Sequence, residues 1–139
     1  MLEHIREIKS EGDAFMTTLT KPEWAVMSAL WEKSPLTMSG IIAAMGDKMD
    51  WKYNTYATYV KRLCTKGFIA YNVLGRDNFY YPAVQKDECI VAESKNLIEK
   101  ISERSAKALL VCMLKDVKLT KKDCDELSEL IEQLKKESL

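Results

Sequence analysis

The sequence predicts a mainly helical protein with one small β-hairpin. An amphipathic helical pattern runs from Asp50 to Ile69, with Gly67 as a residue that tolerates the left-handed conformation of a helix end. Two runs of strand-forming residues follow at 69–74 and 79–81, separated by turn residues at 75–78. A helix followed directly by a hairpin is the arrangement of the recognition helix and the wing in a winged helix-turn-helix DNA-binding domain. We expect this domain to be followed by a helical dimerisation region.

Size and composition are compatible with this plan. The chain has 139 residues and 47% hydrophobic content, enough for one packed domain or for a small domain with an oligomerisation segment. No apolar run approaches the ~20 residues that span a bilayer. The charged N-terminus lacks the apolar core of a signal peptide. We therefore expect a cytoplasmic protein without membrane contact.

Positive charge is concentrated in the middle of the chain. The formal net charge is zero, but residues 51–86 contain six cations and one anion, a net charge of +5. Residues 1–50 carry −3, from five cations and eight anions. A local basic segment is the electrostatic footprint of a nucleic-acid-binding protein.

Metal, cofactor and catalytic chemistry find little support in the residue pattern. The cysteines at 64, 89, 112 and 124 form no close pair, and each falls in a predicted helix as an expected small core residue. There is one histidine, His4, and no glycine-rich phosphate loop. We expect no metal site, no cofactor and no enzymatic activity.

The chain before the hairpin divides into an arm and two helices. Residues 1–18 are expected to form an N-terminal arm, and residues 19–85 the winged domain. Thr20 as N-cap, Pro22 in the first turn and Glu23 three residues after the cap predict a helix from Lys21 to about residue 33. Leu36 is expected to form a minimal strand against the wing. Thr37 or Ser39 should then cap a second helix that ends at Gly46.

The helix at 53–66 carries the candidate DNA-binding residues. Its core face gathers Tyr56, Tyr59, Val60, Leu63 and Cys64. The opposite face has short polar side chains suited to base edges, then cations suited to phosphates, and the wing at 69–83 adds an arginine at its tip. The proposed DNA-binding residues are Lys52, Asn54, Thr55, Thr58, Lys61, Arg62 and Arg76. Alone, such a face is more often a solvated surface, and Trp51 could pack or reach a phosphate.

Residues 86–139 show three amphipathic helical patterns and no strand signal. The first begins near Lys86 and the second near Ser105. The residues of the first helix that are expected inward are Ile90, Val91, Leu97, Ile98 and Ile101. Thr120 and Asp123 cap the third. Three short helices cannot easily bury their apolar faces alone, so a second copy of the chain is expected to cover them. The expected dimer contacts are Leu109, Met113, Leu127, Leu130, Ile131 and Leu134.

The chain resembles the penicillinase-repressor family of bacterial transcription regulators. The resemblance lies in LTKPEWAVMSALW at 19–31, DWKYNTYATYVKRLCTKGFIAY at 50–71, and the wing ending FYYP. It implies a homodimeric winged-helix repressor of a palindromic double-stranded DNA operator. Family members often open the recognition helix with Ser-Pro, where this chain has Lys52 and Tyr53.

The mode of induction is not specified by the resemblance. Resistance repressors of the family are cut at an Asn-Phe bond, and the corresponding residues here are Cys112 and Met113. The CxC pattern of the copper-responsive branch is absent from the sequence. An upstream sensor or protease stays unknown. A winged fold used for protein assembly alone is the alternative, and the salt dependence of duplex binding separates the two.

Overall fold

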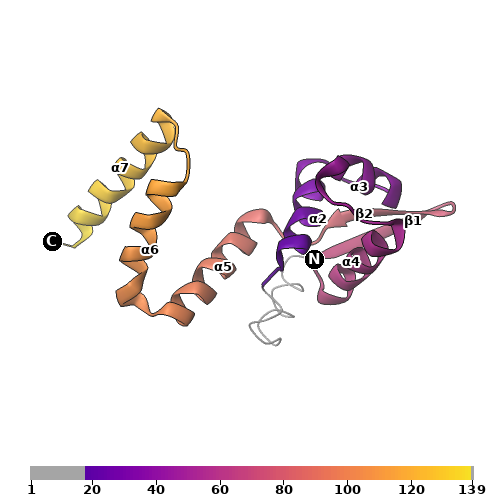
Figure 1. Cartoon of the computed structure of the whole chain (residues 1–139), viewed down its shortest axis with the longest axis horizontal. Coiled ribbons are helices and arrows are strands. Elements are labelled where there is room, and N and C mark those ends of the chain that lie inside the picture. The colour runs from indigo at the N-terminus through magenta and orange to yellow at the C-terminus, as the bar shows by residue number, and fades with distance from the viewer. Residues whose placement is uncertain (1–17, 139) are drawn as a thin grey trace. The chain divides into compact units, whose positions relative to one another are not determined.

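The computed structural model describes residues 18–138 of the chain, so most of the expected arm at 1–18 lies outside the described residues. The elements are α2 (Lys21–Glu32), α3 (Met38–Met45), the 3-10 turn η2 (Gly46–Lys48), α4 (Tyr53–Lys66), β1 (Ile69–Leu74), β2 (Asp77–Pro82), α5 (Lys86–Ile101), α6 (Glu103–Asp116) and α7 (Lys121–Glu137) (Figure 1). The prediction of a mainly helical fold with one hairpin is confirmed. The chain forms two compact units, divided between Leu97 and Ile98.

Helix α2 begins at the capping box that the sequence predicted. The Thr20 hydroxyl accepts a hydrogen bond from the Glu23 backbone N–H at 3.4 Å, and the Glu23 carboxylate accepts one from the Thr20 backbone N–H at 2.9 Å. These bonds satisfy two of the N–H groups that a helix start leaves unpaired. The inner side of α2 is then buried completely at Val26, Met27 and Leu30.

Helix α3 is joined to the wing through Leu36. The Leu36 backbone exchanges two hydrogen bonds with that of Tyr80, at 2.8 and 2.9 Å, which confirms the predicted minimal strand. Thr37 rather than Ser39 is the cap, since its hydroxyl accepts from the Gly40 N–H at 3.1 Å. The start of α3 is therefore fixed beside β2.

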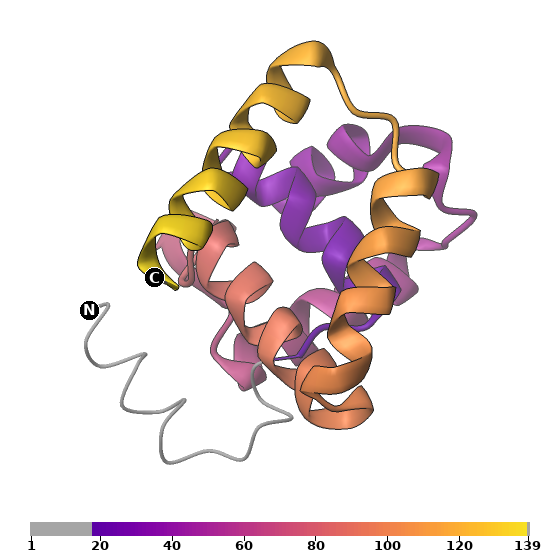
Figure 2. The ribbon, with the colours of Figure 1, turned by 90° about the vertical axis from the view of Figure 1, so that its left-hand side faces the viewer.

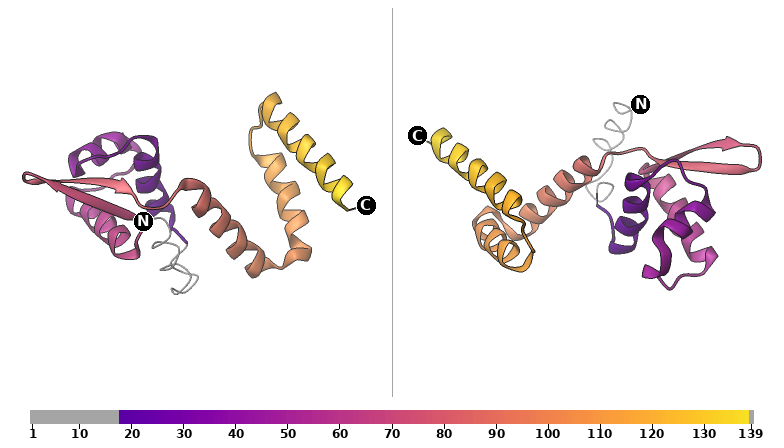
Figure 3. Two further views of the ribbon diagram at one scale, coloured as in Figure 1. Left: turned by 180° about the vertical axis from the view of Figure 1, so that it is seen from behind. Right: turned by 90° about the horizontal axis from the view of Figure 1, so that it is seen from above.

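The wing is an antiparallel hairpin with register Ile69 to Pro82 through Leu74 to Asp77. Its loop is two residues long, Gly75 and Arg76, so β2 begins two residues earlier than the turn at 75–78 predicted. Gly75 has φ +66°, a conformation that glycine adopts without a steric penalty. Both views in Figure 3 show the hairpin projecting from the helices of its unit.

The core of the first unit lies between α2, α3, α4 and the base of the hairpin, and it includes the start of α5. The Trp31 indole N–H donates to the Val84 carbonyl at 3.0 Å, and the Leu19 N–H donates to the Glu93 carboxylate at 3.1 Å. Cys89 is fully buried. The expectation that Ile90 and Val91 face inward was wrong: they are 48% and 51% exposed because the turn of α5 that meets the core presents Cys89.

In a single chain, the helices α6 and α7 of the second unit leave their apolar side chains exposed or only partly covered. Within α6 and α7, all of whose residues are described, no residue is buried. Figure 2 shows the two helices diverging from the loop that joins them. The expected capping box of α7, from Thr120 and Asp123, is confirmed. None of the described helices is long and apolar enough to cross a membrane.

Two cysteines do not have the core positions that the sequence predicted. Cys112 on α6 and Cys124 on α7 are exposed, and Cys64 is half-buried. The reason is the same for both exposed thiols: the apolar sides of α6 and α7 are not covered by other parts of the described chain.

Candidate nucleic-acid interface

Helix α4 presents a polar surface to solvent because its apolar residues are used by the core. Tyr56, Val60 and Leu63 are buried, and Gly67 ends the helix with φ +87°. The exposed positions of the helix and its N-cap are Lys52, Tyr53, Asn54, Thr58, Lys61, Arg62 and Thr65, and Thr55 is half-buried. The structure thus places six of the seven expected DNA-binding residues on or just before one helix. Arg76 lies apart from them, exposed at the tip of the wing.

The threonines of this surface have a restricted hydrogen-bonding capacity. The Thr58 hydroxyl donates to the backbone carbonyl of Asn54 at 2.8 Å, and the Thr65 hydroxyl donates to the backbone carbonyl of Lys61 at 3.1 Å. A hydroxyl has one proton to donate. Thr58 and Thr65 therefore offer a partner an oxygen lone pair and a methyl group. The side chain of Asn54 keeps both its amide N–H donors and its amide oxygen acceptor.

An aromatic stack fixes one edge of α4. Trp51 stacks on Tyr59, with ring centroids 4.7 Å apart and planes at 20°, and meets Tyr56 edge-on at 5.1 Å. The Trp51 ring therefore packs against α4. The Arg62 guanidinium lies 5.4 Å from the Tyr59 ring centroid, within range of a cation–π contact. The Tyr59 ring thus stabilises the Arg62 guanidinium at the edge of the exposed surface.

Lys66 points toward Glu23, and its side chain is only 23% exposed. Its ammonium nitrogen lies 2.8 and 3.0 Å from the two carboxylate oxygens of Glu23, whose side chain has no exposed area. Burial raises the pKa of the Glu23 carboxyl, but hydrogen bonds from Lys66 and Thr20 and the Lys66 charge outweigh it, and the pKa lies below its ordinary value. The charge of Lys66 is therefore balanced within the domain.

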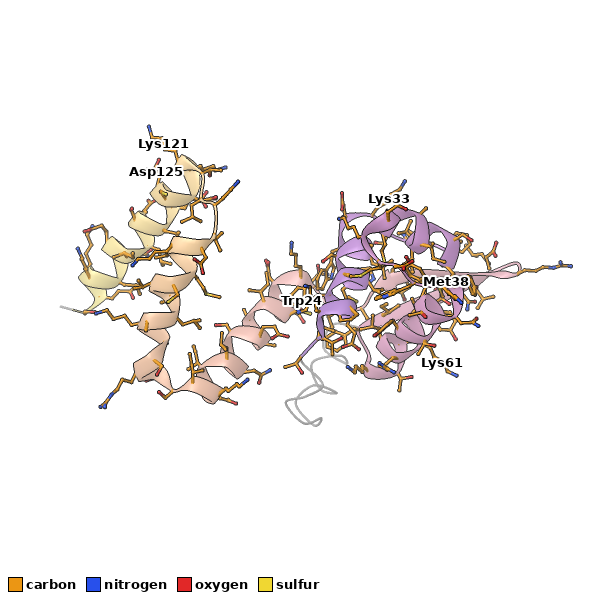
Figure 4. All side chains as sticks on the ribbon, in the orientation of Figure 1. Trp24, Lys33, Met38, Lys61, Lys121 and Asp125 are labelled. Atoms are coloured by element: carbon orange, nitrogen blue, oxygen red, sulfur yellow. The ribbon has the colours of Figure 1, made fainter. Side chains whose placement is uncertain are left out.

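Two hollows open between α4, the start of α3 and the wing. The larger, about 580 Å³, is lined by Met38, Tyr53, Ala57, Val60, Lys61, Cys64, Thr65, Tyr71, Asn78 and Tyr80. The smaller, about 330 Å³, is lined by Thr37, Met38, Ser39, Tyr53, Arg76, Asp77, Asn78 and Tyr80. Figure 4 labels Met38 and Lys61, which lie toward the end of this unit from which the wing projects. Burial raises the pKa of the Cys64 thiol, which favours its neutral form.

Several residues of these hollows were missed by sequence reasoning. Tyr53, Ser39 and Asn78 come together from three separate elements, and Tyr71 shares the wing face of Tyr80, their ring centroids 5.6 Å apart. The register of the hairpin decides which wing side chains face α4. Alternation along 69–74 was the signal in the sequence, but it does not say which face meets the helix.

The residues expected to form a dimer lie unburied on α6 and α7. Met113, Leu130, Ile131 and Leu134 are about half exposed, at 47% to 52%, and Leu109 and Leu127 are partly covered. On α7 the spacing of Leu127, Ile131 and Leu134 places them along one side of the helix. This stripe is an apolar surface that the described chain leaves uncovered.

Comparison with known proteins identifies the family. The penicillinase repressor family matches residues 19–133. The chain belongs to this family. It is 26% identical over 113 residues to the methicillin resistance regulatory protein MecI of Mammaliicoccus sciuri, covering 81% of this chain and 92% of the relative. It is 22% identical over 118 residues to the penicillinase repressor of Staphylococcus aureus, covering 85% and 94%.

A solved structure of similar type is that of Bacillus licheniformis BlaI, in its monomeric form with the blaP half-operator. The identity is 24% and the TM-score 0.46, with 51% of this chain and 87% of that chain covered. As a member of the penicillinase repressors, the protein is a DNA-binding transcriptional repressor and not an enzyme. The predictions of family, fold class and general function are confirmed.

Proposed function

We propose that this member of the penicillinase repressor family recognises the bases of its operator with α4 and binds the DNA backbone with flanking cations. The observation that carries the proposal is the polar surface of α4. There the exposed Asn54 and Thr58 and the half-buried Thr55 precede Lys61 and Arg62. Short polar side chains at the start of a helix suit base edges in a major groove, and cations beyond them suit phosphates. Lys52 and Arg76, both exposed, would extend the phosphate contacts to either side of the helix.

Within this surface Asn54 is the strongest candidate for base recognition. A side-chain amide pairs in bidentate fashion with the N6 and N7 groups of adenine. Thr58 has its proton directed to the Asn54 carbonyl, so it suits a base-edge donor or a thymine methyl group. The operator should therefore contain an A·T pair opposite the first turns of α4.

A second copy of the chain completes the proposed repressor. The half-exposed apolar side chains of α6 and α7 need a partner surface, and the same stripe on another copy supplies one through a two-fold axis. The contacts would be Leu109, Met113, Leu127, Leu130, Ile131 and Leu134. A two-fold dimer presents two copies of α4, which calls for an operator with inverted half-sites. A bacterial repressor has to meet its DNA operator in the cytoplasm, so the cytoplasm is the location that we propose.

Duplex titration tests the proposal. Duplexes selected from a random pool by the full chain should share an A·T-containing motif repeated in inverted orientation. Their binding should weaken steeply as salt is raised, because phosphate contacts release counterions. Scrambled duplexes of the same length should bind more weakly at every salt concentration. Failure to bind any duplex would remove the proposal.

A further inference from the structure

Packing in the core does not explain why a tyrosine stands at position 53. It is the first residue of α4 and is 59% exposed, so the core does not require its ring. It lines both hollows beside the wing, the smaller together with Arg76 and Asn78 and the larger together with Lys61. Because Tyr53 lines both hollows, its hydroxyl is placed to contact a ligand that extends from one hollow into the other.

The chemistry of the walls points to an anion. Arg76 lines the smaller hollow together with the polar side chains of Thr37 and Ser39, and Lys61 lines the larger. Tyr53 and Asn78 line both hollows. Hydroxyl, amide and guanidinium groups are the side chains that contact phosphate oxygens and sugars in protein–DNA interfaces. Asp77 also lines the smaller hollow, and its carboxylate would oppose an anion there.

We propose that Tyr53 and Arg76 together seat one phosphate of the operator backbone in the smaller hollow, between α4, the start of α3 and the wing. This inference rests on the proposed DNA-reading role of α4. A helix lying in the major groove beside a wing leaves one sugar-phosphate strand between them, and these hollows are the space between those two elements. Tyr53 donates its phenol proton to a phosphate oxygen, and Arg76 supplies the charge. Ser39 and Asn78 lie in the same wall and complete the polar surroundings.

Two changes separate the neutral contribution from the charged one. Tyr53→Phe removes one hydroxyl from an exposed ring, so its fold and thermal unfolding should match those of the parent. It should weaken binding to all duplexes by about tenfold, as loss of a hydrogen bond to a charged group does, and leave the salt slope unchanged. Arg76→Gln should weaken binding and also reduce the salt slope by about one unit. Asp77→Asn should strengthen binding to all duplexes.

A matched control lies on the same wing. Tyr81 pairs with Ala70 in the hairpin, so its side chain lies on the wing face opposite that of Tyr80. Tyr81→Phe removes the same chemical group away from the hollows and should leave DNA affinity unchanged.

The closing experiment is a methylphosphonate scan of a selected duplex. A single neutral linkage at the seated phosphate should weaken binding of the parent. The same linkage should cause a smaller loss for Tyr53→Phe and for Arg76→Gln than for the parent, because each variant has already lost part of that contact. Additive losses at every position, or equal affinities of Tyr53→Phe and the parent, would overturn the assignment while leaving the reading role of α4 intact. A parent that binds no duplex would overturn both.

Discussion

Lys66 at the end of α4 forms an ion pair with Glu23 at the start of α2, with the ammonium nitrogen 2.8 Å from the nearer carboxylate oxygen. Glu23 also accepts the capping hydrogen bond from the Thr20 N–H. One fully buried carboxylate therefore closes the first turn of α2 and fixes the last turn of the helix proposed to read DNA. The pair joins the end of α4 to the start of α2.

Lys66→Met should destabilise the winged domain by about 2–4 kcal/mol, because it leaves the Glu23 carboxylate buried without its cation. Lys61→Met removes the same charge from an exposed site on the same helix and should change the free energy of unfolding by less than about 0.5 kcal/mol. Urea unfolding of the three proteins measures both changes. Equal stabilities for Lys66→Met and the parent would show that the pair contributes nothing to the fold.

Acid should weaken the fold through the same carboxyl group. Its pKa in the folded protein lies below the ordinary value of 4.5, so its ionised form is stabilised by folding. This stabilisation is complete above that ordinary value and is lost as the pH falls through the lower folded-state pKa. Urea unfolding between about pH 6 and about pH 3 should show a stability gap between the parent and Glu23→Gln that narrows toward acid. A gap that stays constant would contradict this role of Glu23.

The preference of the protein for its selected duplex over a scrambled one should depend on Asn54. Asn54→Ala should cost about 1–3 kcal/mol on the selected duplex and much less on a scrambled one, because the amide reads a base edge. Thr58→Ala should follow the same pattern with a smaller loss, since its hydroxyl proton is held by the Asn54 carbonyl. Fluorescence anisotropy with both duplexes gives the ratio. Equal losses on the two duplexes would place Asn54 on the backbone instead.

The cations should determine the salt dependence. Replacing Lys61 or Arg62 by Gln should weaken every duplex and reduce the slope of log affinity against log salt by about one unit each. Lys33, the C-cap residue directly after α2, is an exposed cation outside the proposed interface (Figure 4). Lys33→Gln should therefore leave the slope unchanged. Titrations at several salt concentrations compare them. An unchanged slope for Lys61→Gln would remove that residue from the phosphate contacts.

The elements with local causes were predictable from the sequence. The capping boxes at Thr20 and Thr120, the stop at Gly67 and the hairpin depend on residues near one another in the chain, and the structure has all of them. These features depend on backbone hydrogen bonding and φ preferences that a few residues decide.

Features that join distant residues were not predictable in the same way. Lys66 counts as part of the basic segment in the sequence, but its partner lies 43 residues away at Glu23. The Thr58 hydroxyl looks free until its bond to the Asn54 carbonyl is seen. The hollow between Tyr53 and Arg76 depends on the hairpin register and on the packing of α3, which periodicity does not determine.

The dimer carries the central claim, because one winged domain meets one half-site while two linked domains meet both. The measurement is titration of a palindromic duplex with the Leu130→Glu/Leu134→Lys variant, with sedimentation equilibrium on the same sample. A matched control, Glu129→Lys/Lys136→Glu, exchanges charges on the other side of α7 and should stay dimeric. The apolar-stripe variant should be a folded monomer that loses roughly 10²–10⁴ in affinity for the palindrome while keeping its affinity for a single half-site. A monomer that binds the palindrome as tightly as the parent, or a variant that remains dimeric, would contradict the account.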